Sequence, residues 1–264
     1  MRPFHGVRHP TAIAFDLTAR CRAYATKMPR ESFFNSITAA QLMGLPLPLA
    51  LEQTTTIHVA VEAPAFAPAG RGVRGHKVQL MGDDARMWRG MRVASPTRVW
   101  CELAAVLSLH DLVAAGDYLV AWELPLCSIA DLRDAVARYP GRRGRRHLES
   151  ALVLLSDRSE SPQESRLRVI LALAGITGLV ANLRITVRGR RFRADLALPT
   201  WKLAIEYQSD YHRDPGQWRK DMTKREILAT VGWHTMHVNA DDLKDGVELV
   251  ERILVVISSR RHAD

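Results

Sequence analysis

The chain of 264 residues has few cysteines and no long apolar segment. Its cysteines, Cys21, Cys101 and Cys127, are odd in number and show no CxxC spacing, which argues against a disulfide framework and a zinc site. No apolar run approaches the length of a membrane span, and the opening MRPFHGVRHP lacks the apolar stretch of a signal peptide. We therefore expect a cytoplasmic protein that has no membrane partner.

Positive charge is in excess. The chain has 37 Lys and Arg against 28 Asp and Glu, a net charge of +9, and a sequence pI near 9.9. Hydrophobic residues at 47% and charged residues at 25% are typical of a folded globular protein. Such a charge attracts polyanions, so DNA is the expected partner, and nothing in the sequence indicates a small-molecule cofactor. The oligomeric state stays open.

A basic loop marks the expected domain junction. The segment 139–146, YPGRRGRR, contains helix-breaking Pro and Gly, and four of its eight residues are arginine. We predict an α+β domain over 1–150 and a second domain over 151–264. The loop is either a solvated surface loop or a phosphate-contacting one, since clustered arginines bind phosphates without reading sequence. The arginines concerned are Arg142, Arg143, Arg145 and Arg146.

The N-terminal half mixes helices and strands. A helix is expected to end at Gly44, before a Leu-Pro-Leu-Pro segment. Alternating β-branched residues predict a strand at 54–61, with another near 76–81. Further helices are expected after Ser95, which Pro96 follows, after Ser108, and over 128–139.

The C-terminal half has a clear order of elements. Ser161 is expected to cap a helix, with Pro162 in its first turn and Glu164 closing a capping box. The elements expected after it are strands at 182–187, 191–198 and 202–207, a helix at 216–230, a strand at 234–238 and a helix at 246–258. This order predicts an α/β domain with a mixed sheet and helices on its faces.

Two carboxylates are symmetric about a predicted hairpin. Asp195 and Glu206 lie at equal distances from the Thr200–Trp201 turn, so they should face each other across the two strands. Alternation puts Asp195 on one face together with Arg193 and Ala197. The other face is expected to carry Phe192, Ala194, Leu196 and Leu198.

Two opposed carboxylates require a compensating charge. Like charges directly across a sheet are destabilising, and a divalent cation such as Mg²⁺ is a natural counter-ion for carboxylate oxygens. The alternative is a structural salt-bridge cluster in which Arg193 or Lys202 supplies the charge. The polar segment after the second strand, YQSDYHRD (207–214), favours a functional site.

These motifs resemble the core of the PD-(D/E)XK nucleases. Glu164 on a first helix, Asp195 in RADLA, Glu206 and Gln208 in AIEYQ, and the following pair His212 and Arg213 fall in the family's order. Within that superfamily the sequence is most similar to a bacterial group whose domain is akin to the very-short-patch mismatch repair endonuclease. The similarity covers about 155–258. It implies a restriction-endonuclease-like αβββαβ core and a hydrolase acting on DNA.

The resemblance also implies roles for individual residues. Asp195 and Glu206 would ligate Mg²⁺ or Mn²⁺, with the carbonyl of Tyr207 as a third oxygen. Glu164 would act from the helix directly or through water, and His212 would be a general base or a phosphate contact.

One departure concerns the superfamily's lysine, which is Gln208 here. A neutral amide orients water or phosphate but supplies no positive charge, so reduced or absent cleavage is an open alternative. Basic residues near the motifs are expected to contact the DNA backbone; for the helical ones the alternative is a solvated basic face. They are Arg193, Arg213, Arg219, Lys220 and Lys224. His234 and His237 are interpreted as packing residues.

The N-terminal half resembles a region that accompanies such nuclease domains in actinobacterial chains. The resemblance rests on the segments ITAAQLMGL (37–45), SPTRVW (95–100) and DLVAAGD (111–117). That region is similar in part to antitoxins of abortive-infection toxin–antitoxin systems. No complete winged helix precedes it here, so sequence-specific DNA reading by this half is not expected.

Three functions remain open at this point. The first is a metal-dependent DNA endonuclease in repair, restriction or defence. The second is a DNA-binding regulator or antitoxin whose nuclease-like domain has lost turnover. The third is a protein-interaction module with an incidental basic surface, because a fold does not fix an activity.

Overall fold

The computed structural model describes residues 4–7, 16–208 and 215–261, without the side chains of 215–221 and 261. The chain forms two compact units. Unit 1 comprises Met1–Val120 and Leu124–Leu155, and unit 2 comprises Ala121–Glu123 and Ser156–Asp264. Within the described ranges, no helix is both long enough and apolar enough to cross a membrane.

Unit 1 is built on a five-stranded mixed sheet of order β3-β2-β1-β5-β4. Its strands are β1 (Phe33–Phe34), β2 (Ile57–Glu62), β3 (Val73–Val78), β4 (Ala85–Trp88) and β5 (Met91–Ala94). β2 pairs in parallel with β3 and antiparallel with β1. The expected strand near 76–81 begins earlier, because the parallel pairing with β2 starts at Val73 opposite Ile57.

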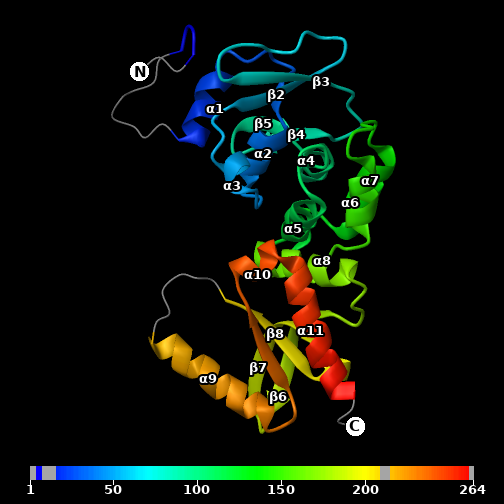
Figure 1. Ribbon diagram of the computed structural model, residues 1–264. Helices are drawn as coiled ribbons and strands as arrows, with labels where there is room; N and C mark the ends of the chain where they lie inside the picture. The colour runs from blue at the N-terminus through cyan, green and yellow to red at the C-terminus, as the bar shows by residue number, and fades with distance from the viewer. Residues whose placement is uncertain (1–3, 8–15, 209–214, 262–264) are drawn as a thin grey trace. The chain divides into compact units, whose positions relative to one another are not determined.

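Helices complete unit 1 (Figure 1). They are α1 (Leu17–Ala25), α2 (Ser36–Met43), α3 (Leu49–Glu52), α4 (Pro96–Leu103), α5 (Leu109–Val120), α6 (Ile129–Arg138) and α7 (Arg145–Leu152). The predicted helix boundaries hold where capping chemistry defines them. Ser95 caps α4, Ser128 caps α6, and Gly44 ends α2 in the left-handed conformation.

A buried ion network fastens α4 within unit 1. The Arg98 guanidinium lies 2.8 Å from Glu102 Oε1 and 2.8 Å from Asp84 Oδ2, and its side chain is only 4% exposed. Glu102 Oε2 in turn accepts hydrogen bonds from Asn35 Nδ2 and the Ser36 N–H. Each charge in the network therefore has a partner, which is the condition for burying charge without a large penalty.

Unit 2 has the predicted order of elements. They are α8 (Pro162–Leu173), β6 (Val180–Val187), β7 (Arg190–Leu198), η1 (Pro199–Trp201), β8 (Leu203–Tyr207), α9 (Pro215–Ala229), β9 (His234–Val238), α10 (Ala240–Lys244) and α11 (Gly246–Arg261). The strand order is β6-β7-β8-β9, with two antiparallel pairs followed by a parallel one. The predicted mixed sheet in an α/β arrangement is thus confirmed.

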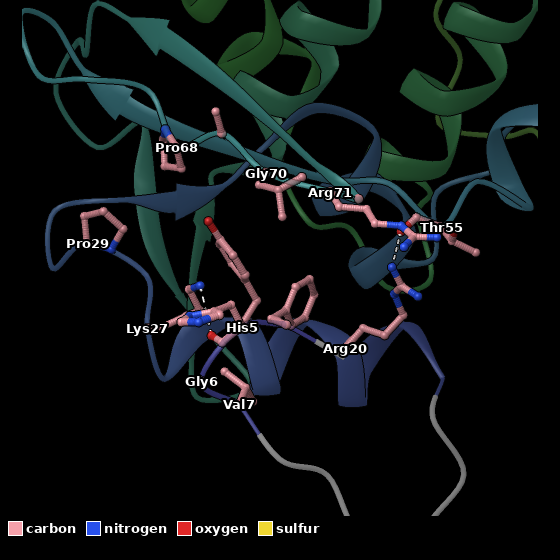
Figure 2. Close-up of a pocket in the computed structure, with 15 residues that line it drawn as sticks. His5, Gly6, Val7, Arg20, Lys27, Pro29, Thr55, Pro68, Gly70 and Arg71 are labelled. Carbon is pink, nitrogen blue, oxygen red and sulfur yellow. Dashed lines mark hydrogen bonds between the residues drawn. The ribbon is translucent and has the colours of Figure 1, made fainter. Parts of the chain in front are cut away.

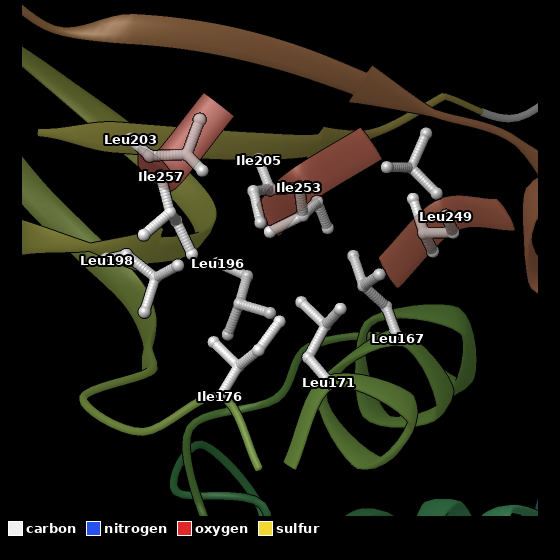
Figure 3. Packing of buried hydrophobic residues seen from close by; sticks show 11 residues of the cluster. Leu167, Leu171, Ile176, Leu196, Leu198, Leu203, Ile205, Leu249, Ile253 and Ile257 are labelled. Carbon is white, nitrogen blue, oxygen red and sulfur yellow. The ribbon is translucent and has the colours of Figure 1, made fainter. Parts of the chain in front are cut away.

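Helices cover both faces of this sheet, with α9 on one side and α11 on the other (Figure 1). Under α8 and α11, Leu196 and Leu198 of β7 pack with Leu167 of α8 and Ile253 of α11 (Figure 3). The opposite face is smaller and rich in alanine. Its buried residues are Ile185, Val187, Ala194, Ala197, Ala204 and, from α9, Leu228.

The expected alternation along β7 is wrong at one point. Phe192 and Ala194 pack on the α9 side, whereas Leu196 and Leu198 pack on the α8 side. The change coincides with Asn182 of β6, which has a φ of +52°. Ladder pairs flank this position, Ala181 with Leu196 and Leu183 with Ala194. The left-handed residue shifts the pleat by one, so Arg193 and Ala197 lie on opposite faces and Asp195 lies at the change.

Candidate active site

Asp195 lies within β7, next to Leu196, the first residue of that strand that is paired with β8. The register of these strands pairs Leu196 with Ile205, and these two residues are the chain neighbours of Asp195 and Glu206. Asp195 Oδ2 accepts a hydrogen bond of 2.9 Å from the N–H of Tyr207. The paired residues of β7 and β8 have the register that the spacing about the turn predicts, and the facing of the two carboxylates across it stays a prediction.

Glu206 is held by a lysine from α9. Lys224 Nζ lies 2.8 Å from Oε1 and 2.8 Å from Oε2 of Glu206. It also donates to the carbonyl of Arg193, on β7, at 2.6 Å. The side chains of Lys224 and Glu206 are only 20% and 15% exposed, so solvent screens the pair weakly. The structure thus brings a cation to the Glu206 carboxylate from α9.

The basic residues named as alternative counter-charges bind elsewhere. The Arg193 guanidinium pairs with Glu160 Oε1 at 2.6 Å. Lys202 Nζ donates to the carbonyl of Val231. Lys224, which the sequence suggested only as a DNA contact, makes the ion pair with Glu206.

Glu164 reaches the site from the first turn of α8. Ser161 caps this helix by accepting a hydrogen bond from the Glu164 N–H. The Glu164 carboxylate accepts from the N–H of Glu160 at 3.0 Å and from Asn182 Nδ2 at 3.2 Å. Burial raises the pKa of Glu164, and the nearby charge of Asp195 raises it further. Glu164 and Asp195 therefore interact electrostatically.

A glutamine–histidine pair joins the residue that follows β8 to β9. Gln208 Nε2 and His237 Nδ1 are 2.8 Å apart, and the backbone N–H of Gln208 donates to the carbonyl of Val238. His237 is paired in register with Glu206 across the parallel β8–β9 ladder. The sequence interpretation of His237 as a packing residue missed this contact. Asn182, whose amide reaches Glu164, was missed as well.

Several predicted contact residues fall outside this cluster. His212 and Arg213 lie outside the described residues, as do the side chains of Arg219 and Lys220 on α9. The arginine-rich segment belongs to unit 1, where Arg142, Arg143 and Arg146 are exposed, and the expected loop ends at Gly144, because Arg145 and Arg146 begin α7.

Arg145, the first residue of α7, has a structural role. Its guanidinium donates to the carbonyls of Val136 and Tyr139 at the end of α6, and it pairs with Glu149. Arg145 thereby ties the loop to two helices of unit 1, since a cation at a helix C-terminus satisfies carbonyls that lack intrahelical partners.

The oxygen groups near Asp195 are not preassembled as a metal cage. In the part of the chain that the structure describes, no group of three or more His, Cys, Asp or Glu side chains is arranged to hold a metal ion. Asp195 accepts a hydrogen bond from the N–H of Tyr207, the residue after Glu206, and Glu206 holds the ammonium of Lys224.

A large hollow lies elsewhere, in unit 1. It has a volume of about 1310 Å³, and Arg20, Lys27 and Arg71 are among its lining residues (Figure 2). Arg20 donates to the carbonyl of Thr55, and Lys27 to that of His5. No carboxylate is among the described residues that line it, so this hollow is not a metal site of the kind expected for phosphodiester chemistry.

Comparison with known proteins gives few matches. No protein-family model matches the chain. The chain is 28% identical over 233 residues to uncharacterized proteins of two Mycobacterium tuberculosis strains, and the alignment covers 87% of this chain and 82% of each relative. This alignment is longer than either unit, so the similarity runs through both. Among solved structures, the catalytic domain of a homing endonuclease matches with 23% identity and a TM-score of 0.30, over 37% of this chain and 94% of that domain.

Proposed function

We propose that unit 2 is a metal-dependent nuclease domain that hydrolyses DNA phosphodiester bonds, with Asp195 and Glu206 as its metal ligands. The observation that carries the proposal is that Asp195 and Glu206 adjoin the paired residues Leu196 and Ile205, with Asp195 bonded to the Tyr207 N–H and Glu206 to the ammonium of Lys224. The αβββαβ order and the net charge of +9 support a restriction-endonuclease-like core acting on a polyanion.

The donor set suits Mg²⁺ or Mn²⁺ on one condition. Carboxylate oxygens are the ligands that these ions prefer, and the lysine already shows that this position attracts a cation. Because Lys224 contacts both oxygens of Glu206, it must release at least one of them before Glu206 can ligate. When bound, the ion would polarise the phosphate and lower the pKa of a water molecule.

The chain's own residues then supply positioning and charge. Lys224, kept near the strand by the Arg193 carbonyl, provides the positive charge that Gln208 cannot provide, and it balances charge developing on the phosphate. His237 fixes the side-chain amide of Gln208, which orients water or a phosphate oxygen. Glu164 contributes a further carboxylate from α8, and the hydrogen bond from Asn182 Nδ2 holds that carboxylate in position.

The second candidate is a DNA-binding regulator without turnover. The ion pair between Lys224 and Glu206 favours it, because the pair neutralises Glu206 without any metal. The substitution of the superfamily's lysine by Gln208 favours it too. In this case unit 2 would keep its nucleic-acid surface and never hydrolyse the bound strand.

A nicking assay separates the two candidates. The full chain is incubated with Mg²⁺ or Mn²⁺ and duplex, mismatched, branched or single-stranded DNA. The nuclease proposal predicts cleavage of at least one substrate and its loss in Asp195→Asn and Glu206→Gln. Glu226→Gln is the matched control, since Glu226 is an exposed carboxylate on the same helix as Lys224. Binding without cleavage of any substrate would support the regulator instead.

A further inference from the structure

The β6–β7 hairpin concentrates arginine on a short piece of chain. Five arginines lie between positions 184 and 193. They are Arg184, Arg188, Arg190, Arg191 and Arg193. Sequence order alone does not show which of these arginines share a face of the hairpin, but the strand register does.

The register divides these arginines between two faces. Ile185, Val187 and Ala194 are buried towards α9, so their alternate neighbours lie on the opposite face. That face carries Arg184, Arg191 and Arg193, which are all exposed, and we call it the arginine face. Arg190 lies on the α9 side, over the ring of Phe192 at 5.7 Å.

Within the arginine face, like charges are brought directly together. Arg184 is paired in register with Arg193, and Arg191 is paired with Thr186. Cross-strand neighbours of like charge destabilise a sheet unless an anion compensates. Glu160 compensates Arg193, at 2.6 Å. Further anionic groups would therefore be bound favourably along this face.

The spacing of the arginine face fits a phosphate backbone. Alternate residues of a strand are roughly 6.8 Å apart. This separation is close to the through-space distance between neighbouring phosphates along one strand of duplex DNA. Arg191 and Arg193 are therefore two steps of a row on β7 that ends two residues before Asp195, where the pleat of the strand changes. Guanidinium groups bind phosphate oxygens in a bidentate manner.

Among residues 184–193, the exposed residues of this face are arginines and Thr186. Protein–protein interfaces instead have an apolar or aromatic centre. We propose that the arginine face binds the sugar–phosphate backbone of duplex DNA and leads one strand to Asp195 and Glu206. The second part of this inference rests on the proposed nuclease function, but the binding itself does not.

The test compares matched arginine variants of the full chain. Binding of a labelled DNA duplex is followed by fluorescence anisotropy in EDTA over a range of NaCl concentrations. For Arg184→Ala with Arg191→Ala, we expect weaker binding to all sequences and a log–log salt slope reduced by about 1.8, since each lost phosphate contact removes about 0.9. Arg190→Ala removes one positive charge from the other face of the hairpin and should leave the slope unchanged, whereas a single lost phosphate contact would lower it by about 0.9.

Folding and ligand class are controlled separately. Arg184→Lys with Arg191→Lys keeps the charge and should retain the salt slope, which a misfolded hairpin would not. An unchanged slope in the double alanine variant would overturn the inference, and so would an equal loss in Arg190→Ala. Competition by polyglutamate as strong as that by DNA would overturn the assignment to nucleic acid.

Failure of this inference and failure of the proposed function give different results. Because EDTA removes metal, binding through the arginine face is measured without cleavage. Arginine-dependent binding by a chain that cleaves nothing in Mg²⁺ or Mn²⁺ would leave the inference standing and overturn the nuclease. Cleavage by the wild type, with unchanged binding in the double alanine variant, would support the nuclease and overturn the arginine-face inference.

Discussion

Replacing Lys224 with methionine removes the ammonium that contacts both oxygens of Glu206, while keeping a side chain of similar length. Breaking a fully buried ion pair costs about 3–5 kcal/mol and an exposed one about 0–1 kcal/mol. With 20% and 15% of the two side chains exposed, we expect a loss of about 2 kcal/mol in metal-free buffer. At roughly 4 °C per kcal/mol, the melting temperature of unit 2 should fall by roughly 8 °C.

Added Mn²⁺ should reverse this loss, because it replaces the missing counter-charge. An ion that binds only the folded state adds about 2.7 kcal/mol at a concentration of one hundred times its Kd. In the wild type, Lys224 competes with the ion for Glu206, so the same Mn²⁺ concentration should raise the melting temperature less than it does in Lys224→Met.

Differential scanning calorimetry in EDTA and in rising Mn²⁺ measures both effects. Arg225→Met is the matched control, since Arg225 is the adjacent exposed cation of α9. This variant should change neither the melting temperature in EDTA nor its rise with Mn²⁺. Adding Asp195→Asn to Lys224→Met should abolish the Mn²⁺ shift. A wild-type shift equal to or larger than that of Lys224→Met would refute the competition between lysine and metal.

Three further predictions follow from buried titratable groups. Burial raises the pKa of Glu164 above its usual 4.5, so the free energy of unfolding of unit 2 should fall as pH rises through the folded pKa. Urea unfolding at several pH values measures this dependence, and Glu164→Gln should flatten it. Burial lowers the pKa of His58 to about 4 from 6.5, so unit 1 should lose stability as pH falls between these values, and His58→Gln should reduce the loss. Arg98→Met leaves the buried carboxylate of Glu102 without its cation and should destabilise unit 1 by about 3–5 kcal/mol, part of which the added change Glu102→Leu should recover in the same measurement.

The features that sequence predicts well in unit 2 are local. The β7–β8 register follows from spacing about a short connection, so the pairing of Leu196 with Ile205, next to the two carboxylates, could be predicted from the chain. Ser161 and Pro162 define the start of α8 through capping chemistry that involves adjacent residues. In each case the interacting groups are close in sequence, and few alternative pairings compete.

The features that escaped prediction depend on tertiary contact. Lys224 is 18 positions from Glu206, and nothing in the basic pattern of α9 distinguishes it from its neighbours. His237 meets Gln208 through the parallel β8–β9 pairing, which joins segments far apart in sequence. The left-handed Asn182 interrupts alternation in an otherwise ordinary strand, so period-two reasoning places Phe192 on the wrong face.

Three fully buried alanines under α9, Ala194, Ala197 and Ala204, have a consequence beyond packing. Small side chains let a helix lie close to a sheet, and a tightly packed interior does not absorb added volume without displacement. The stem of Lys224 has a limited reach, so the thickness of this alanine layer bears on how closely its ammonium approaches Glu206. A larger side chain there would move α9 away from the strands without altering any charged residue. The chemistry of the site is thus set partly by the volume of residues that carry no functional group.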